Sequence, residues 1–201
     1  MTDDVMVDPE TLRSEVRDKY REVAEKPAGD FHFHTGRRLA ARCGYPTAEV
    51  EALPDAAVES FAGVGNPFAL RRLEPGERVV DVGAGAGFDC FLASGAVGDS
   101  GHIVGVDMTP EMLDRARRTA ADMGTSNVEF REGLCEDLPV EDGWSDVVIA
   151  NGVLNLVADK KQAFSEVWRV LRAGGVLQFA DIANGLPVPE EAVRDIDLWT
   201  A

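Results

Sequence analysis

From about residue 75 onward, short apolar runs alternate with longer segments whose apolar residues recur every three or four positions. The short runs predict buried strands, and the longer segments predict amphipathic helices. Regular alternation of the two is typical of an α/β fold with a doubly wound, mostly parallel sheet. We expect strands at 78–82, 102–107, 127–131, 145–150 and 175–181.

Three helices are expected between these strands, at about 87–96, 110–123 and 160–172. Gly124 follows the second helix, and Gly174 with Gly175 follows the third, as glycines commonly do at helix ends. In the third helix, four large apolar residues recur at helical spacing: Phe164, Val167, Trp168 and Leu171. We expect this face to pack against the sheet as core rather than to line a cofactor site.

Residues 1–74 follow a different pattern, so we divide the chain into an N-terminal helical appendage (1–74) and an α/β domain (75–201). The appendage has a charged helical segment over 9–26, a break that includes 31–34, one further short helix, and a loop over 61–67. Lying ahead of the first strand, it would cover the carboxyl edge of the sheet, where open α/β folds bind ligands. It could be a lid, a substrate wall, or a packing extension without a chemical role.

The first expected strand runs through Asp81 directly into three glycines spaced two apart, Gly83, Gly85 and Gly87. Glycine allows a strand to stop abruptly and lets the backbone touch a ligand. A dinucleotide turn of the G-x-G-x-x-G kind needs Gly or Ala where this chain has Phe88. The pattern instead favours a ligand that lacks pyrophosphate and carries an amino-acid end and an adenosine, such as S-adenosylmethionine.

A second acidic residue, Asp107, ends the next expected strand, 20 residues beyond Gly87. This is the spacing of an acid that holds a ribose, whose two hydroxyls one carboxylate can accept. The alternatives are a plain strand-to-helix turn at the glycines and a helix cap at Asp107. Because Thr109 and Pro110 already supply the cap and the first helical position, we predict that Asp107 contacts the cofactor.

Composition narrows the possible partners. The 201 residues carry a formal net charge of −16, which repels nucleic acid and anionic membranes, so we expect small-molecule chemistry without either partner. No apolar run approaches the ~20 residues of a membrane span, and the acidic start is unlike a secretory signal, so we expect a cytoplasmic protein. The three scattered cysteines and three histidines predict neither a disulfide framework nor a metal site.

Several blocks in one order resemble the class I S-adenosylmethionine-dependent methyltransferases, within the branch shared by arsenite methyltransferases and the ubiquinone/menaquinone-biosynthesis type. The likeness covers roughly residues 60–201. Besides the glycine turn and Asp107, its blocks are 65–67, 87–92, 105–113, 138–139, 146–151 and 169–175. The resemblance implies a Rossmann-like sheet of strand order 3-2-1-4-5 and an enzyme that transfers a methyl group to a small-molecule acceptor by in-line displacement.

The family usually ends with another helix and two more strands, for which nothing after Asp181 has room. Either the sequence is a piece of a longer one, or its fifth strand leaves an edge that needs a partner, such as a second copy in a homodimer.

The resemblance also implies a cofactor site. Asp81 would orient the methionine end, Met108 would flank the adenine, and Asn151 would line the methionine side. Leu134 stands where related enzymes often carry an acid for the adenine amino group, so backbone groups near Cys135 would bind adenine instead. The predicted cofactor contacts are Asp81, Gly83, Ala84, Gly85, Gly87, Asp107, Met108, Leu134, Cys135 and Asn151.

Arsenite methyltransferases bind trivalent arsenic through cysteine thiolates, because a soft metalloid prefers soft sulfur ligands. In this chain Val64 and Gly152 occupy positions where that family would place thiols, and a third thiol would be expected just beyond 199–201. We expect Cys90 and Cys135 to be small buried apolar residues rather than arsenic ligands. We therefore expect the cofactor and the fold that the resemblance implies, but not arsenite as the substrate.

The sulfonium of the cofactor is already an activated methyl donor, so alignment and exclusion of water matter more than a strong catalytic side chain. A general base would help with a carbon, oxygen or nitrogen acid, and the candidates by position are His32, His34, Asn151, Asn155 and Asp181. By resemblance, Tyr20 and Asn66 are candidates for contact with the acceptor. The alternatives to this enzyme are a module that binds S-adenosylmethionine or its demethylated product without turnover, an NAD-dependent oxidoreductase, and a true arsenite methyltransferase.

Overall fold

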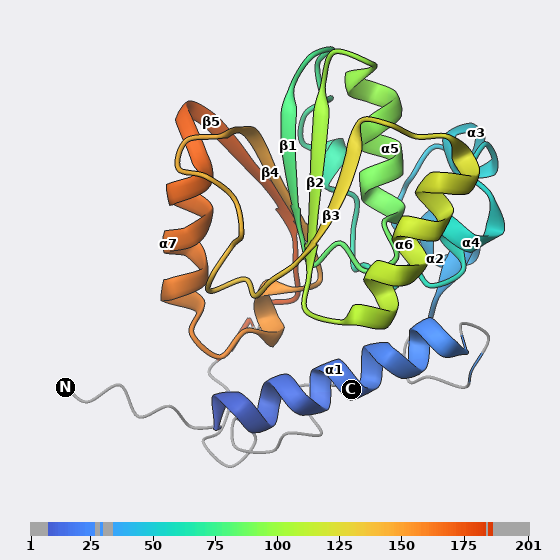
Figure 1. Cartoon of the computed structure of the whole chain (residues 1–201). Coiled ribbons are helices and arrows are strands. Elements are labelled where there is room, and N and C mark those ends of the chain that lie inside the picture. The colour runs from blue at the N-terminus through green and yellow to red at the C-terminus, as the bar shows by residue number, and fades with distance from the viewer. Residues whose placement is uncertain (1–7, 27–28, 30–33, 184, 187–201) are drawn as a thin grey trace.

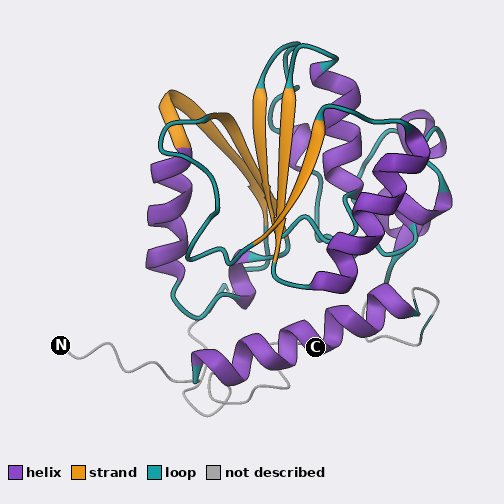
Figure 2. Cartoon of the chain, viewed as in Figure 1, coloured by secondary structure: helices purple, strands orange, loops and turns teal. Residues whose placement is uncertain are grey.

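The computed structural model describes residues 8–26, 29, 34–183 and 185–186. Its centre is a five-stranded parallel sheet in the order β3-β2-β1-β4-β5. The strands are β1 (Arg78–Val82), β2 (His102–Asp107), β3 (Val128–Glu132), β4 (Ser145–Asn151) and β5 (Leu171–Ala180). Helices α5 and α6 cover one face and α7 the other, as Figure 1 and Figure 2 show. The predicted fold class and strand order are confirmed.

The covering helices are α5 (Phe88–Val97), α6 (Pro110–Met123) and α7 (Lys160–Val170), and a 3₁₀ turn, η2 (Leu154–Leu156), follows β4. Helix α6 has the predicted bounds, because Pro110 suits the first helical turn and Gly124 adopts the left-handed conformation that ends it. The three central strands, β1, β2 and β4, are buried on both faces, and Val79, Val80 and Val82 of β1 are fully enclosed. The sheet therefore provides a rigid frame for the loops at its carboxyl edge.

The appendage contains α1 (Pro9–Glu25), α2 (Gly36–Arg42), α3 (Thr47–Glu51), α4 (Asp55–Val58) and the 3₁₀ turn η1 (Pro67–Ala69). Only one short helix was predicted between α1 and the 61–67 loop, where the structure has three. Helix α1 runs across the carboxyl edge of the sheet (Figure 1). Arg115 of α6 donates to the carbonyls of Ala24 and Ala56 and pairs with Glu59, so one side chain holds both α1 and α4 on the domain.

The boundary between α7 and β5 differs from the prediction. Helix α7 ends at Val170, and β5 begins at Leu171 rather than at 175. In the pairing with β4, Ser145 lies opposite Leu171 but Val147 lies opposite Val176, so the extra residues of β5 form an irregularity that contains both glycines. The sequence predicts a helix end at Gly174 and Gly175. In the structure both glycines lie inside β5, where its pairing with β4 is irregular.

The predicted core face of α7 is wrong for two of its residues. Val167 is buried, but Phe164 is 40% exposed and Trp168 is 81% exposed. The helix is turned because buried Glu166 accepts hydrogen bonds from the backbone N–H of Leu138 and from Arg169. These hydrogen bonds hold Glu166 toward the protein interior and leave the rings of Phe164 and Trp168 facing solvent.

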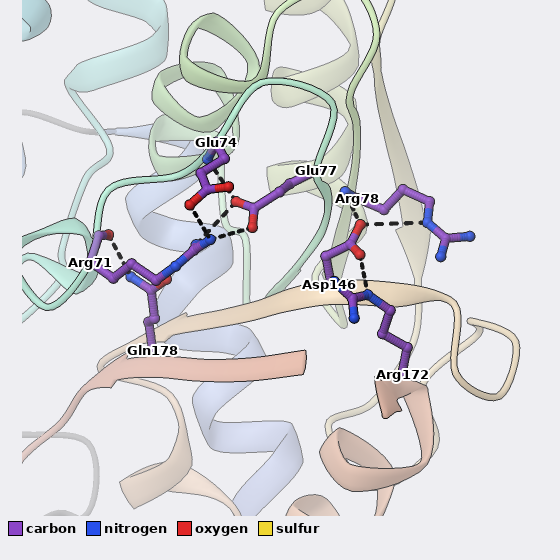
Figure 3. Close-up of polar contacts among 7 residues, drawn as sticks. All are labelled: Arg71, Glu74, Glu77, Arg78, Asp146, Arg172 and Gln178. Atoms are coloured by element: carbon purple, nitrogen blue, oxygen red, sulfur yellow. Dashed lines mark hydrogen bonds and ion pairs between the residues drawn. The ribbon is translucent and has the colours of Figure 1, made fainter. Parts of the chain in front are cut away.

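Two separate groups of charged and polar contacts support the sheet (Figure 3), and the first lies at the amino ends of the strands. Asp146 of β4 accepts from the backbone N–H of Arg78 at 2.7 Å and pairs with the side chains of Arg78 and Arg172. The second group lies nearer the other end of β5, where Gln178, opposite Ile149 of β4, donates to the carbonyl of Arg71 at 2.9 Å. The Asp146 contacts stabilise the side of the sheet that faces away from the ligand edge. Among the helices that the structure describes, none is long and apolar enough to cross a membrane.

Candidate cofactor site

A cleft opens at the carboxyl edge of the sheet, between the glycine turn, the loops that follow β2, β3 and β4, and helix α1. Nine predicted cofactor residues lie on its wall: Asp81, Gly83, Ala84, Gly85, Asp107, Met108, Leu134, Cys135 and Asn151. Gly87 does not. It lies behind the turn, where an added Cβ would approach the Phe130 ring to 2.8 Å. Gly87 is therefore required for packing, whereas the other nine residues border the cleft.

The first two glycines of the turn adopt positive φ angles, 73° at Gly83 and 53° at Gly85, which strain residues with a side chain. A Cβ at Gly83 would lie 2.1 Å from the side chain of Val153, so that position is closed by the protein itself. At Gly85 no atom lies within 4 Å of an added Cβ. Bare backbone at Gly85 thus faces open space on the cleft, which fits a ligand that approaches closely.

The carboxylate of Asp107 connects the ends of β1 and β2. It accepts hydrogen bonds from the backbone N–H of Gly85 and of Thr109, both at 2.8 Å. The cap of α6 had been assigned to Thr109, but its hydroxyl makes no capping hydrogen bond, and Asp107 bonds the Thr109 N–H instead. Burial raises the pKa of Asp107, although these N–H groups oppose the shift. Each carboxylate oxygen can still accept a further hydrogen bond from a ligand hydroxyl.

Asp81 lies at the bottom of the cleft and is almost completely buried. It accepts a hydrogen bond from the Cys90 thiol at 3.1 Å, and it forms no ion pair with any residue that the structure describes. Burial raises the pKa of Asp81 well above its usual value, and the negative charge of Asp89 raises it further. A cationic ligand group beside Asp81 would reverse both effects, which fits the ammonium of an amino-acid end.

Two residues of the site, Asp89 and Tyr45, were not found from the sequence. Asp89, in the first turn of α5, lies on the cleft wall and accepts from the Tyr45 hydroxyl at 2.6 Å and from the Asn151 amide at 3.1 Å. Burial raises the pKa of Asp89 to about 6, even though both hydrogen bonds lower it. The available signal was a carboxylate among the apolar residues of Phe88–Leu92, because such a group is buried with its helix and needs donors.

Asn151 borders the cleft, but its amide is bound to the protein on both sides. Its Oδ1 accepts from the backbone N–H of Val64 and Gly65, and its Nδ2 donates to the Gly65 carbonyl. The same Nδ2 also lies within hydrogen-bond distance of Tyr45 and Asp89. These contacts make Asn151 a support for the neighbouring loop and do not favour it as a base.

The remaining candidate bases are not brought to the cleft. His34 is exposed and lies off the wall, and His32 falls outside the described residues, as do 199–201. Asp181 also lies off the wall and accepts from the backbone N–H of Asn155 and Ile182. Of the two acceptor-side candidates, Tyr20 lies on the wall, whereas Asn66 bonds the N–H of Phe68 in its own loop.

Val64 and Gly152 occupy the two positions where the resemblance would place thiols. They are neighbours in space, since a Cβ on Gly152 would lie 3.2 Å from the Val64 side chain. Cys90 is buried, and Cys135 lies half-buried on the cleft wall. Burial raises the pKa of both thiols, so they stay protonated. Across the described ranges, no group of three His, Cys, Asp or Glu side chains is placed to hold a metal ion.

Two buried polar atoms of cleft residues have no hydrogen-bond partner in the described part of the chain, Ser60 Oγ and Arg13 Nε. Ser60 is only 5% exposed, and a buried polar atom left unpaired costs about 1–3 kcal/mol. Unpaired polar groups that border a cleft favour a polar ligand there.

The fold and the cleft define a Rossmann-like domain that receives a nucleoside-type ligand at the ends of β1 and β2. Comparison with known families is more specific. The methyltransferase domain family matches residues 73–199, and the chain belongs to this family.

Individual relatives agree. An arsenite methyltransferase from Halobacterium salinarum is 40% identical over 96% of this chain and 53% of its own length. A ubiquinone/menaquinone biosynthesis C-methyltransferase from Vibrio campbellii is 34% identical over 60% of this chain and 47% of its own. The crystal structure of an arsenic(III) S-adenosylmethionine methyltransferase from Chlamydomonas reinhardtii is 35% identical, with a TM-score of 0.62, and the match covers 79% of this chain and 53% of that one.

The chain thus spans about half the length of these relatives. The predicted family and its cofactor, S-adenosylmethionine, are confirmed.

Proposed function

We propose that this chain is the cofactor-binding part of an S-adenosylmethionine-dependent methyltransferase that acts on a small-molecule acceptor. The single observation that carries the proposal is the convergence of Asp81, bare backbone at Gly85 and Asp107 on one cleft. When bound, the cofactor supplies a methyl group on a positively charged sulfur, so alignment and exclusion of water are the main tasks of the protein.

Each group on the cleft suits one end of this cofactor. Asp107 would accept the ribose hydroxyls, and Asp81 would receive the ammonium of the methionine end. Met108, Leu134 and Cys135 would border the adenine. None of these roles requires a proton transfer.

The appendage (1–74) is proposed as the wall and lid of the site. Arg13, Val16 and Tyr20 of α1 lie on the cleft wall, and Arg13 pairs at 2.9 Å with Glu136, in the loop that follows β3. A helix held across the opening in this way would exclude water from the methyl group. This interpretation favours a lid over a packing extension without a role.

The acceptor is proposed to be a small organic molecule rather than arsenite. Val64 and Gly152 lie side by side and provide no sulfur ligand. The second candidate function is arsenite methylation, which the 40% identical relative favours.

Calorimetry with S-adenosylmethionine and with NAD tests the cofactor. We expect binding of the first alone, and binding of NAD alone would refute the proposal. Turnover with a quinol, with a thiol, and with arsenite in the presence of a thiol then separates the acceptor classes. Cofactor binding without methylation of any of these acceptors would instead favour the non-catalytic binding module.

We also propose a cytoplasmic location and a homodimer. All three cysteines are free, as is usual in reducing compartments. Strand β5 is at an edge of the sheet, and beside it Phe164, Trp168 and Phe179 form an exposed aromatic group, here named the α7/β5 patch. Such a patch beside an unpaired strand is suited to a second copy of the chain.

A further inference from the structure

Asp89, Tyr45 and Asn151 form a buried cluster at the end of the cleft, here named the Asp89 node. Its members come from three separate parts of the chain: the loop after α2, the start of α5 and the end of β4. The Tyr45 hydroxyl donates to Oδ1 of Asp89, and the Asn151 amide nitrogen lies 3.1 Å from Oδ2 of the same carboxylate and 3.0 Å from the Tyr45 oxygen. The appendage and the cofactor turn are thus joined through one carboxylate.

The node determines the position of a glycine-containing segment. Asn151 accepts from the N–H groups of Val64 and Gly65 at 2.9 and 3.2 Å, and donates to the carbonyl of Gly65 at 2.9 Å. A Cβ at Gly63 would lie 2.4 Å from Asn151, and a Cβ at Gly65 would lie 2.7 Å from Ala180 Cβ. The 63–65 segment is therefore pressed against the ends of β4 and β5, with Gly63 on the cleft wall.

We propose that Asp89 is a positioning residue whose ionised carboxylate fixes the orientation of Asn151, and that Asn151 thereby holds the 63–65 segment as the acceptor-side wall of the cleft. The functional part of this inference rests on the proposed methyltransferase activity. The positional part depends only on the contacts above.

The chemistry of the node requires an acceptor at Asp89. Both groups that face the carboxylate are donors, the Tyr45 hydroxyl and the Asn151 Nδ2. In Asp89→Asn, nearly equal in size, one acceptor oxygen is replaced by a donor NH₂ group. The Tyr45 hydroxyl can turn to accept from this NH₂ group, but the neutral amide oxygen is a weaker acceptor for Asn151 Nδ2 than the carboxylate, so Asn151 loses the charge-assisted hydrogen bond that fixes its orientation.

The direct test is residue-resolved hydrogen exchange by NMR on the chain without cofactor. In Asp89→Asn, we expect the amides of Val64 and Gly65 to exchange about tenfold faster, as expected for the loss of one hydrogen bond. The amides of Val80 and Val148, inside the sheet, should keep their rates, which shows that the fold is intact. Unchanged exchange at Val64 and Gly65 would overturn the proposal.

Tyr45→Phe provides a second and milder variant, because it removes one donor and keeps the carboxylate. We expect a smaller increase in exchange at the same two amides, about two- to threefold. The matched control is Asp122→Asn, which removes an acidic charge from the exposed side of α6 and should change neither amide. A response to Asp122→Asn equal to that of Asp89→Asn would show a general charge effect and refute the node.

The pH dependence gives an independent readout. Asp89 faces Tyr45 and Cys43 from the appendage, Asp81 from β1 and Cys90 on its own helix. The pKa values of the tyrosine and of both thiols are raised, so these groups stay neutral, and Asp81 is the other acid that titrates. With the pKa of Asp89 at about 6, protection of the two amides, corrected for intrinsic exchange, should fall as the pH decreases through 6.

Two variants show which carboxylate causes this change in amide protection with pH. Asp81→Asn should keep it, at a lower pH because a neighbouring negative charge is gone, whereas Asp89→Asn should abolish it. A transition that persists in Asp89→Asn would refute the role of this carboxylate. Since no cofactor is present, the outcome is separate from that of the proposed function, which fails if S-adenosylmethionine does not bind the native chain.

Discussion

Three of the carboxylates that border the cleft, on Asp81, Asp89 and Asp107, have a pKa that burial raises. None of them forms an ion pair with a described residue, so their hydrogen bonds come from neutral groups. Negative charge in a desolvated site is unfavourable unless a cation or further donors enter. A ligand with an ammonium, a sulfonium and two ribose hydroxyls supplies these groups, whereas a dinucleotide would add the negative charge of its pyrophosphate.

Asp107→Ala should weaken the affinity for S-adenosylmethionine by about 1–3 kcal/mol, because charged hydrogen bonds to the ribose are lost. Titration calorimetry at constant salt measures the change. Glu132→Ala at the end of β3, off the cleft wall, serves as the control. An unchanged dissociation constant for Asp107→Ala would show that this carboxylate is not the ribose ligand.

Ser60→Ala should affect the affinity for S-adenosylmethionine without lowering the free energy of unfolding. The Ser60 hydroxyl has no partner in the described chain, so its removal should leave the free energy of unfolding unchanged or slightly raised. If the hydroxyl turns toward the ligand, affinity for S-adenosylmethionine should fall by about 0.5–1.5 kcal/mol, as for a neutral hydrogen bond. Denaturant unfolding and calorimetry measure the two effects.

The matched control for this prediction is Ser145→Ala. That hydroxyl is buried at the start of β4, away from the cleft, and donates to the carbonyl of Val170 at 3.0 Å. The control should lose stability and keep its affinity, the reverse of Ser60→Ala. If Ser60→Ala lowers stability and leaves affinity unchanged, the hydroxyl has only a structural role.

The sequence reveals a residue of the site when its signal is local. Asp107 follows from a fixed spacing after the glycine turn, and it is found at the cleft. Tyr45 and Asp89 are 44 positions apart, and Val64 and Asn151 are 87 apart. These pairs meet only because the appendage folds back onto the sheet, and no periodicity or spacing encodes that contact.

At the level of elements, the amino ends of β1, β4 and β5 are held together by Asp146 (Figure 3). Burial raises the pKa of this carboxyl, but the hydrogen bonds from Arg172 and from the Arg78 N–H outweigh it, so the pKa is lowered below 3.8. A group whose pKa is lowered by folding stabilises the fold above its unfolded pKa. That contribution is lost as the pH falls through the folded pKa.

Asp146→Asn should therefore lower the free energy of unfolding at pH 7 by about 1–3 kcal/mol. The difference from the native chain should narrow as the pH falls from the ordinary carboxyl value of 3.8 through the lower pKa of the folded protein. Urea unfolding at a series of pH values measures it. Asp142→Asn is the control, because its carboxylate is 82% exposed and its ion pair with Arg169 is of the weak surface kind. Equal effects of the two variants would contradict a special role for Asp146.

In the α/β domain the element types were predicted well, but one boundary and one helix face were not, and in the appendage one short helix was predicted where the structure has three. The bounds of β1, β2 and α6 match because apolar runs and end signals coincide there. At α7 and β5 they conflict, since two glycines that resemble a helix end lie inside a strand. The face of α7 depends on the pairing of Glu166 with Arg169 and the Leu138 N–H, and this pairing outweighs apolar periodicity.

For the whole molecule, the arrangement of the layers explains why one edge of the sheet is the site. The amino edge is tied by charged groups, whereas the carboxyl edge is covered by α1 (Figure 1). The rule that α/β sheets bind ligands at the carboxyl edge predicted this side in advance. The sequence does not identify the acceptor, because the 63–65 segment and α1, which we propose as the acceptor wall, take their positions from tertiary contacts.

The α7/β5 patch leads to a prediction about assembly. Trp168 is 81% exposed, and the rings of Phe164 and Phe179 lie 6.2 Å apart beside the edge strand β5. Trp168→Ser should weaken self-association in sedimentation velocity, because it removes the most exposed ring of this surface. Met123→Ser on α6, which covers the other face of the sheet, is the matched control and should leave association unchanged.

The dependence of self-association on ionic strength provides a second test of the α7/β5 patch. The chain carries a formal net charge of −16, so two copies repel one another at long range. The Debye length falls from about 30 Å at 0.01 M to about 8 Å at 0.15 M ionic strength, so association through the apolar surface should strengthen as salt is added. Association that weakens with salt, or that survives Trp168→Ser unchanged, would place the contact between copies on a charged surface elsewhere on the molecule.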